Sequence, residues 1–331
     1  MKFTVIIPTR NRDRSALELL FYLRRSLEWG CPIVVVDQSD DRGKELANQI
    51  KDSQLNGILH FVHNQRGTSA GRNQGARLAA TDWLLFLDDD VRPAAGYLES
   101  VTNYLKQNPW IDAVQPGLEQ QVAWQQYRKD PKSWNRQRLD VHVRLPESED
   151  KDGVLWFTSS AVAGFETATI GIASGNFAIS RAAYFGAGGF DEQMEGLGED
   201  REFGLRLWWY GYRVYLYPQA VAFHLRESAG GLRYRKSRLS RIFDPEPAVG
   251  SVYFYLKWFP GKPYRRMIGG HFWKQWKRPW VAPLKVIRLY RAIAQAKRRL
   301  ARGAVYLAKP RPRFQVIGAP GSLFQTERRA I

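Results

Sequence analysis

Short apolar runs alternate with longer segments of helical character along the first 90 residues. The apolar runs cover residues 3–7, 33–36, 58–62 and 83–87. The segments that favour helices cover residues 15–29, 44–51 and 69–80. Strands that alternate with helices predict a mainly parallel sheet sandwiched by helices, because each right-handed crossover returns over the sheet. The pattern therefore predicts an α/β fold.

The apolar run over residues 83–87 ends at three consecutive carboxylates, Asp88, Asp89 and Asp90. Three like charges repel one another, and burial would raise their pKa values unless a cation or contact with water offsets the cost. Ligands of open α/β sheets bind outside the carboxyl ends of the strands. Oxygen ligands favour Mg²⁺ or Mn²⁺. The triplet is therefore a candidate metal site, and a solvated acidic turn is the alternative.

Polar side chains lie at two other strand ends and at one helix start. They are Pro8, Thr9 and Arg10 after the first strand, Asp37 at the end of the second, and Arg72 and Asn73 near the start of the third helix. Hydroxyl, carboxylate and backbone N–H groups at such places can meet a base or ribose, and an arginine at a helix start favours a phosphate. Ordinary polar loops and a helix cap are the alternatives.

The sequence lacks the glycine-rich motifs of the common nucleotide-binding folds. Neither G-x-G-x-x-G nor G-x-x-x-x-G-K-[ST] occurs near these strand ends. The first motif brings backbone close to a dinucleotide, and the second cradles the phosphates of ATP. Nicotinamide cofactors and ATP hydrolysis therefore lose support.

Four short motifs follow one another in the first 90 residues. They read F-T-V-I-I-P-T-R-N-R over residues 3–12, I-V-V-V-D-Q-S-D over 33–40, A-G-R-N-Q-G over 70–75 and L-F-L-D-D-D over 85–90. In this order they resemble the family 2 glycosyltransferases. The resemblance implies a Rossmann-like GT-A fold and the inverting transfer of a sugar from a nucleotide-diphosphate donor to an acceptor hydroxyl. The family's second motif is usually closer to D-D-G-S.

The resemblance also implies roles for individual residues of the first half. Thr9 and Asp37 would hold the nucleoside, and Arg72 would lie near the base or the phosphates. Asp88 and Asp90 would form the D-x-D motif that holds Mn²⁺ or Mg²⁺. The neighbouring Pro8, Arg10, Asn73 and Asp89 are then expected to line the nucleotide-sugar site.

The second half carries adjacent carboxylates at the start of a predicted helix, Glu199 and Asp200 in G-E-D-R-E-F-G-L-R-L. A carboxylate that faces a bound sugar can take the proton of an acceptor hydroxyl, an effect worth roughly 10² to 10⁴ in rate. Stabilisation of the helix dipole is the alternative. The resemblance assigns the general base to Asp200, with Glu199 beside it. It also makes His224 a metal or diphosphate contact, although a lone histidine is more often structural.

The net charge of +18 is unevenly distributed. Residues 1–250 hold 31 Lys and Arg against 31 Asp and Glu, whereas residues 251–331 hold 19 against Glu327 alone. Such a tail implies a polyanionic partner, either nucleic acid or an anionic membrane surface. A helix predicted from Pro283 has an apolar face and a basic face. It favours a membrane interface, and packing on the catalytic domain is the alternative.

We expect three parts: a nucleotide-sugar-binding half over residues 1–117, an acceptor-binding and catalytic half over 118–245, and a basic, aromatic-rich, partly helical extension over 246–331. The single cysteine, Cys31, suits a reducing cytoplasm. The sequence contains no clean membrane span of about 20 apolar residues. We therefore expect a cytoplasmic protein that is either soluble or peripheral on the cytoplasmic face of the membrane. The resemblance implies that it acts on a glycan or lipid-linked glycan of surface polysaccharide synthesis.

Two other classes remain as alternatives. A nucleic-acid-binding protein would explain the basic tail, but not the balanced charge of the first 250 residues or the carboxylate triplet. A sugar-nucleotide nucleotidyltransferase should carry glycine and lysine in the loop after the first strand, and residues 9–14 contain neither. We therefore expect a sugar-nucleotide donor and no nucleic acid.

Overall fold

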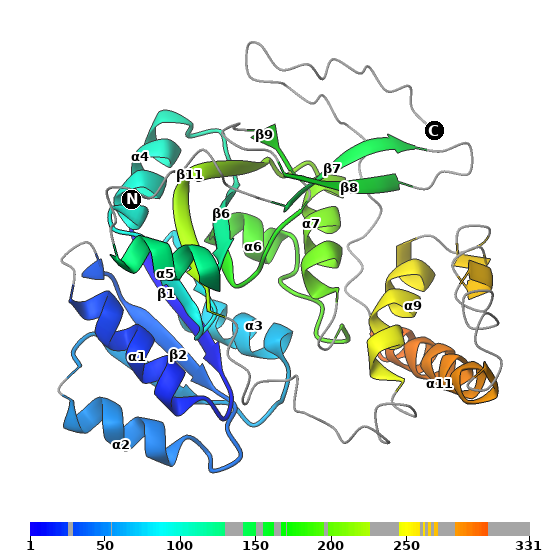
Figure 1. Cartoon of the computed structure of the whole chain (residues 1–331), viewed down its shortest axis with the longest axis horizontal. Helices are drawn as coiled ribbons and strands as arrows, with labels where there is room; N and C mark the ends of the chain where they lie inside the picture. Colours follow the sequence, from blue (N-terminus) through cyan, green and yellow to red (C-terminus); the bar gives the residue numbers. More distant parts are fainter. Residues whose placement is uncertain are drawn as a thin grey trace.

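The computed structural model places the sheet, its helices and part of the C-terminal extension (Figure 1). The described residues are 1–25, 29–53, 55–129, 142–149, 155–161, 167–169, 171–194, 198–225, 245–258, 261, 264–265, 268–270 and 282–303. Residues 226–231 and 271–280 lie outside them, as does most of the segment 130–154.

Within these residues, nine strands form one mixed sheet in the order β3-β2-β1-β4-β10-β6-β11-β5, with β9 paired to β11. The four parallel strands are β1 (Phe3–Thr9), β2 (Ile33–Asp37), β3 (Ile58–Val62) and β4 (Trp83–Leu87). The others are β5 (Val91–Pro93), β6 (Ala113–Gln120), β9 (Thr167–Ala168), β10 (Asn176–Ser180) and β11 (Val214–His224). The α/β fold predicted from the apolar runs is confirmed.

The second half joins the sheet through β10, which runs antiparallel to both β4 and β6. Asn176 at the start of β10 therefore lies opposite Leu87, the last residue before the acidic triplet. A separate hairpin is formed by β7 (His142–Glu149) and β8 (Leu155–Ala161). The pairing of β10 with β4 brings the second half of the chain to the edge where the triplet lies.

Helices cover both faces of the sheet because its central strands are apolar on both sides. Val5 and Ile7 of β1 belong to one hydrophobic core and Ile6 to the other. The helices are α1 (Asp13–Arg24), α2 (Lys44–Asp52), α3 (Thr68–Leu78), α4 (Tyr97–Gln107), α5 (Gln121–Lys129), α6 (Arg181–Gly186) and α7 (Glu199–Trp209). The three helices predicted in the first 90 residues are thus present, with ends that differ by a few residues.

Helix α3 lies unusually close to β1. A Cβ atom at Gly75 would stand only 2.3 Å from Cγ2 of Ile6, so this position requires a residue without a side chain. The close approach sets Arg72, one turn earlier, near the carboxyl ends of β1 and β4. The same helix therefore serves both the core and the candidate site.

The C-terminal extension begins with α9 (Glu246–Trp258), and α11 (Ala282–Ala301) packs against it. Leu289, Ala292 and Ala296 of α11 are buried in a third core together with Leu205 of α7. The apolar face of the basic helix therefore lies inside the protein, as the packing alternative expected. Among the described residues, no helix combines the length and apolar character needed to cross a membrane.

Candidate active site

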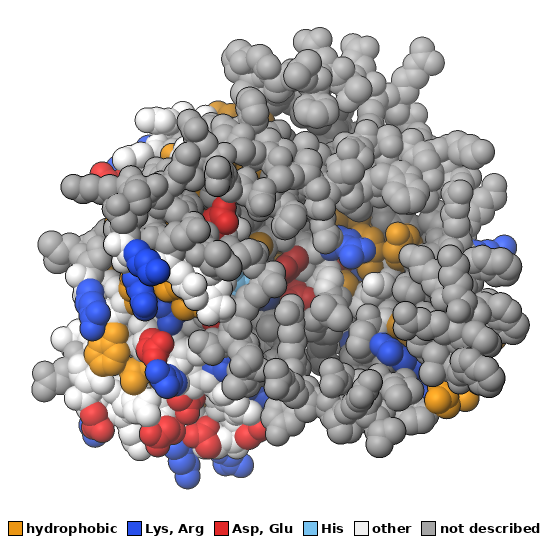
Figure 2. All heavy atoms as spheres, viewed as in Figure 1, with side chains coloured by type: hydrophobic (Ala, Val, Ile, Leu, Met, Phe, Trp, Pro, Cys, Tyr) orange, Lys and Arg blue, Asp and Glu red, His pale blue; other side chains and the backbone are white. Residues whose placement is uncertain are grey.

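The candidate site lies where the carboxyl ends of β1, β2 and β4 meet the end of β11 and the start of α7. Figure 2 shows acidic side chains and a histidine in a recess near the centre of one face. Register places Thr9 opposite Asp37, and the main chain of Leu225 donates to Asp90 at 2.8 Å. The structure thus brings the motifs of both halves of the chain to one place.

Asp89 and Asp90 are enclosed, each only 3% exposed, so the solvated acidic turn is wrong for these two residues. Asp89 accepts hydrogen bonds from Oγ1 of Thr9 at 2.8 Å and from Nη1 of Arg12 at 2.9 Å. Asp90 lies 3.3 Å from the same Nη1 and 3.4 Å from Nε2 of His224. Arg12, which the sequence analysis did not single out, therefore supplies part of the positive charge that the triplet requires.

Burial is the main reason why the pKa of Asp89 is raised to about 7. The positive charge of Arg12 and the hydrogen bond from Thr9 oppose this rise, whereas the neighbouring carboxylates Asp90 and Asp88 add to it. Near neutral pH this side chain is therefore divided between its protonated and ionised forms.

Asp88 faces α3 rather than its two neighbours in the triplet. Its Oδ1 accepts a hydrogen bond from Nη2 of Arg72 at 2.7 Å. Arg72 is 2% exposed, and its Nη1 lies 3.9 Å from Oε1 of Glu199. Within the described part of the chain, the buried Nε of Arg72 has no hydrogen-bond partner. One guanidinium thus contacts acidic groups from both halves of the protein and keeps a donor atom unused.

Glu199 and Asp200 are the first two residues of α7, after a glycine with φ of 106°. Burial, and after it the charge of the adjacent Asp200, raise the pKa of Glu199 to about 7 against the opposing charge of Arg72. Burial also raises the pKa of Asp200, opposed by the charge of Arg72 and by hydrogen bonding from Ser174. Thr68 donates from Oγ1 to Glu199 at 3.2 Å. Oδ1 of Asp200 is buried and has no hydrogen-bond partner among the described residues.

The predicted metal ligands are only partly assembled. Asp90 and His224 lie within 3.4 Å of each other, but Asp88 is turned to Arg72. Among the described residues, no group of three or more His, Cys, Asp or Glu side chains is placed to hold an ion. Mg²⁺ is usually held by one or two carboxylates together with substrate phosphates. Asp90 and His224 therefore fit a metal whose remaining ligands come from a diphosphate.

Asp37 orders the loop that follows β2. Its side chain is fully buried, Oδ1 accepts from the main chain of Ser39 at 2.8 Å, and Oδ2 lies 3.1 Å from Nε2 of His60. Burial alone would raise the pKa of Asp37, but the hydrogen bonds of His60 and Ser39 outweigh it and lower the pKa. A direct contact between Asp37 and a nucleoside stays a prediction.

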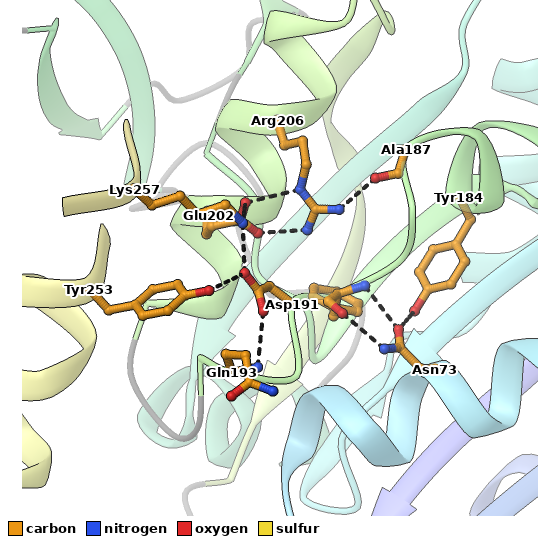
Figure 3. A network of polar contacts seen from close by, with 10 residues as sticks. Asn73, Tyr184, Ala187, Asp191, Gln193, Glu202, Arg206, Tyr253 and Lys257 are labelled. Atoms are coloured by element: carbon orange, nitrogen blue, oxygen red, sulfur yellow. Dashed lines mark hydrogen bonds and ion pairs between the residues drawn. The ribbon is translucent and has the colours of Figure 1, made fainter. Parts of the chain in front are cut away.

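Asn73 joins α3 to Tyr184 of α6 and to the loop at Phe190 (Figure 3). Its Nδ2 donates to the carbonyl of Phe190 at 2.9 Å and to Glu192 at 2.8 Å. Its Oδ1 accepts from the Tyr184 hydroxyl at 2.5 Å and from the main chain of Phe190 at 2.9 Å. All four hydrogen-bonding positions of the amide are used by groups of the protein. A place for Asn73 in the nucleotide-sugar site stays a prediction.

The loop after β1 contributes charges as well as its hydroxyl. Pro8 and Thr9 end the strand, and Nη2 of Arg10 lies 3.3 Å from Asp40 in the neighbouring loop. Asn11 has φ of 52°, a left-handed conformation that few residues adopt. Arg12 belongs to the first motif. Its positive charge, three residues after the end of β1, is the sequence signal that could have identified it.

Comparison with known proteins agrees with this arrangement. Residues 4–163 match the family model described as Glycosyl transferase family 2. Nearly half of the chain is therefore similar to glycosyl transferase family 2. A pre-mycofactocin glycosyltransferase of Mycobacterium tuberculosis is 29% identical over 225 residues, which are 67% of this chain and 42% of that protein. Polypeptide N-acetylgalactosaminyltransferase 3 of Drosophila melanogaster is 26% identical over 60% of this chain and 30% of its own length. The chain thus spans less than half the length of each of these two relatives.

Solved structures show the GT-A fold of this family. GalNAc-T7 with UDP, GalNAc and Mn²⁺ has a TM-score of 0.53 at 17% identity and covers 77% of this chain and 50% of its own. The mannosyltransferase PcManGT from Pyrobaculum calidifontis, in complex with GDP-Man and Mn²⁺, has a TM-score of 0.51 at 19% identity. It covers 91% of this chain and 79% of its own. The GT-A fold expected for the family 2 motifs is confirmed.

We expect the unfolding free energy to fall as pH rises from about 5 to about 7.5. Glu199 and Asp89 have raised pKa values, so the folded protein holds protons that the unfolded chain has already released. One such group contributes a slope of up to about 1.4 kcal/mol per pH unit. Urea unfolding at several pH values measures it, and Glu199→Gln should flatten the curve. The exposed Glu99→Gln is the control, and equal slopes for both variants would contradict the assignment.

Proposed function

We propose that this enzyme transfers a sugar from a nucleotide-diphosphate donor to an acceptor hydroxyl with inversion, and that Asp200 is the general base. The observation that carries the proposal is the contact of one buried arginine, Arg72, with Asp88 on one side and Glu199 on the other. This contact places the donor-side acidic triplet beside the adjacent carboxylates of α7. The groups that bind the donor and the group that deprotonates the acceptor would then lie close together.

The hydrogen bonding and the raised pKa of Asp200 support its role as a base. Its Oδ1 is a buried acceptor without a hydrogen-bond partner among the described residues, and such a group is costly unless something else donates to it. An acceptor hydroxyl would supply the missing donor. The raised pKa makes the carboxylate a stronger base than an ordinary aspartate, which favours proton transfer near neutral pH.

In this mechanism the acceptor oxygen attacks the anomeric carbon from the side opposite the diphosphate. The new C–O bond forms as the bond to the diphosphate oxygen breaks, Asp200 takes the hydroxyl proton, and the configuration inverts. The unused Nε of Arg72 can donate to a departing phosphate oxygen. A Mn²⁺ or Mg²⁺ ion at Asp90 and His224 would add positive charge for the same leaving group.

The donor is proposed to be a sugar linked to a nucleoside diphosphate, because similar structures were solved with UDP-GlcNAc and with GDP-Man. Pro8, Thr9, Arg10 and Asp37 lie at the strand ends where its nucleoside would bind. The acceptor is proposed to be a glycan or lipid-linked glycan.

We further propose that the outward face of α11 rests on an anionic membrane. Ile287 and Tyr290 are 52% and 70% exposed on this helix. Three basic side chains are exposed along it, Arg291, Lys297 and Arg298, and Arg302 is exposed directly after its end. The opposite face is buried against α9, so the helix could bind lipid without leaving the protein. Each cation near an anionic surface contributes about 1 kcal/mol.

Asp200→Asn should abolish transfer while donor binding is retained, because the amide keeps the shape of the side chain but cannot take a proton. We expect a rate at least about 10²-fold lower. Turnover of a panel of nucleotide sugars and calorimetric binding of the donor measure the two effects. The control is Asp82→Asn, the same change at an exposed site. Full turnover by Asp200→Asn would rule out the assignment.

Asp90→Ala should remove the metal dependence of nucleotide binding, because it deletes the carboxylate beside His224. Thermal unfolding with UDP or GDP, with and without Mn²⁺, measures the difference. The wild type should gain stability from nucleotide and metal together, in proportion to the logarithm of ligand over Kd. Asp82→Ala serves as the matched control. The metal assignment fails if Asp90→Ala keeps the same Mn²⁺-dependent shift.

Replacing Arg291, Lys297, Arg298 and Arg302 together by Gln should weaken sedimentation with anionic phospholipid vesicles by at least about 100-fold. The matched control replaces four exposed lysines of the first half, Lys2, Lys44, Lys51 and Lys106. Neutral vesicles should bind neither form. Unchanged sedimentation of the α11 variant, or an equal loss in the control, would contradict a membrane-facing α11.

A further inference from the structure

A buried ionic cluster joins the C-terminal extension to the helix that carries the proposed base (Figure 3). Nζ of Lys257 on α9 lies 2.6 Å from Oδ2 of Asp191 and 2.8 Å from Oε1 of Glu202 on α7. The three side chains are at most 1% exposed. Three segments that are distant in the sequence therefore meet at one ammonium group.

Two further side chains complete the cluster. Arg206 donates from Nε and Nη2 to the two carboxylate oxygens of Glu202, at 2.9 and 2.6 Å. The hydroxyl of Tyr253 on α9 donates to Oδ2 of Asp191 at 2.8 Å. Two anions and two cations are thus buried in balance, and removing one partner would leave an uncompensated charge.

Part of the ionic cluster lies on the same helix as the proposed base, α7. Glu202 lies on the first turn of α7, two residues after Asp200, and Arg206 follows one turn later. A lateral or rotational shift of α7 would therefore move the proposed base as well.

The same cluster reaches the arginine of the site through a loop. Asp191 follows Phe190, whose main-chain N–H and carbonyl are both bonded to Asn73. Asn73 is the neighbour of Arg72 on α3, and the Phe190 ring lies 5.5 Å below the Arg72 guanidinium. Lys257 thus links α7, which carries the proposed base, with the loop that supports Arg72.

The apolar and the ionic contacts between α9 and α7 differ in how precisely they fix the position of α7. The apolar contacts of α9 with Leu205 and Met194 are non-directional and tolerate small displacements. Charge-assisted hydrogen bonds hold short distances and defined angles. An ionic cluster between α9 and α7 can therefore fix the rotation of α7 where apolar packing alone would not.

We propose that Lys257 and Tyr253 of the C-terminal extension are positioning residues that hold the start of α7 against Arg72. The inference rests on the proposed function, since the role of Asp200 as base is itself proposed. On this basis α9 helps to set the geometry of the catalytic site, although neither residue touches the reacting atoms.

The test compares Tyr253→Phe, which removes one hydroxyl, with Val252→Ala, which trims a neighbouring core side chain of α9 outside the cluster. Tyr253→Phe should lower kcat about 5-fold with the donor KM unchanged, whereas Val252→Ala should lower the thermal midpoint and leave kcat within twofold. The double variant Lys257→Met with Asp191→Asn removes one charge of each sign and keeps the cluster balanced. It should lower kcat on the order of 100-fold, as expected for a misplaced catalytic group.

Two results would overturn the proposal: kcat within twofold of wild type in Tyr253→Phe, or a loss of kcat in Val252→Ala equal to that in Tyr253→Phe. Amide hydrogen exchange over residues 198–205, measured without substrate, should be faster in Tyr253→Phe than in Val252→Ala. This readout separates the inference from the proposed function. If wild-type protein turns over no nucleotide sugar, the function fails, and equal exchange in the two variants would show that the positioning role fails as well.

Discussion

The candidate site depends on a single buried guanidinium. Arg72 is the cation that lets Asp88 of the first half and Glu199 of the second half approach one another in a place where burial raises the pKa of carboxylates. The rest of the fold holds that arginine in place. Gly75 brings α3 against β1, and Asn73 fastens the same helix to the loop at Phe190. Loss of this one charge would leave acids from both halves facing each other without compensation.

Local pattern predicted the first half of the fold well because its strands are buried on both faces. The run at 83–87 is apolar throughout and becomes β4, and the triplet that follows does lie at the edge of the site. The role of a polar residue was harder to predict. Asn73 looked like a ligand-binding amide at a helix start, yet its partners come from residues more than 100 positions away, which no local pattern contains. Asp37 likewise has His60 of β3 as a partner.

The C-terminal extension shows that a count of basic residues does not tell which of them are exposed. Its excess of basic residues predicts a polyanionic partner, but Lys257 is one of those residues and is buried as the counter-ion of Asp191 and Glu202. Helical periodicity in α11 fitted both membrane binding and packing, since either needs one apolar face. In the structure the apolar face of α11 packs against α9 and its basic face is exposed, with Tyr290 among the exposed residues.

The link between α9 and α7 also bears on how the molecule is made. Synthesis runs from the N-terminus, so Asp191 and Glu202 leave the ribosome well before Lys257 does. Until then Arg206 pairs with Glu202, and Asp191 lacks the ammonium group that it contacts in the finished cluster. A nascent chain that stops short of α9 would have to keep one of these acids hydrated or protonated. The full set of charge contacts at the start of α7 can therefore form only after Lys257 has been translated.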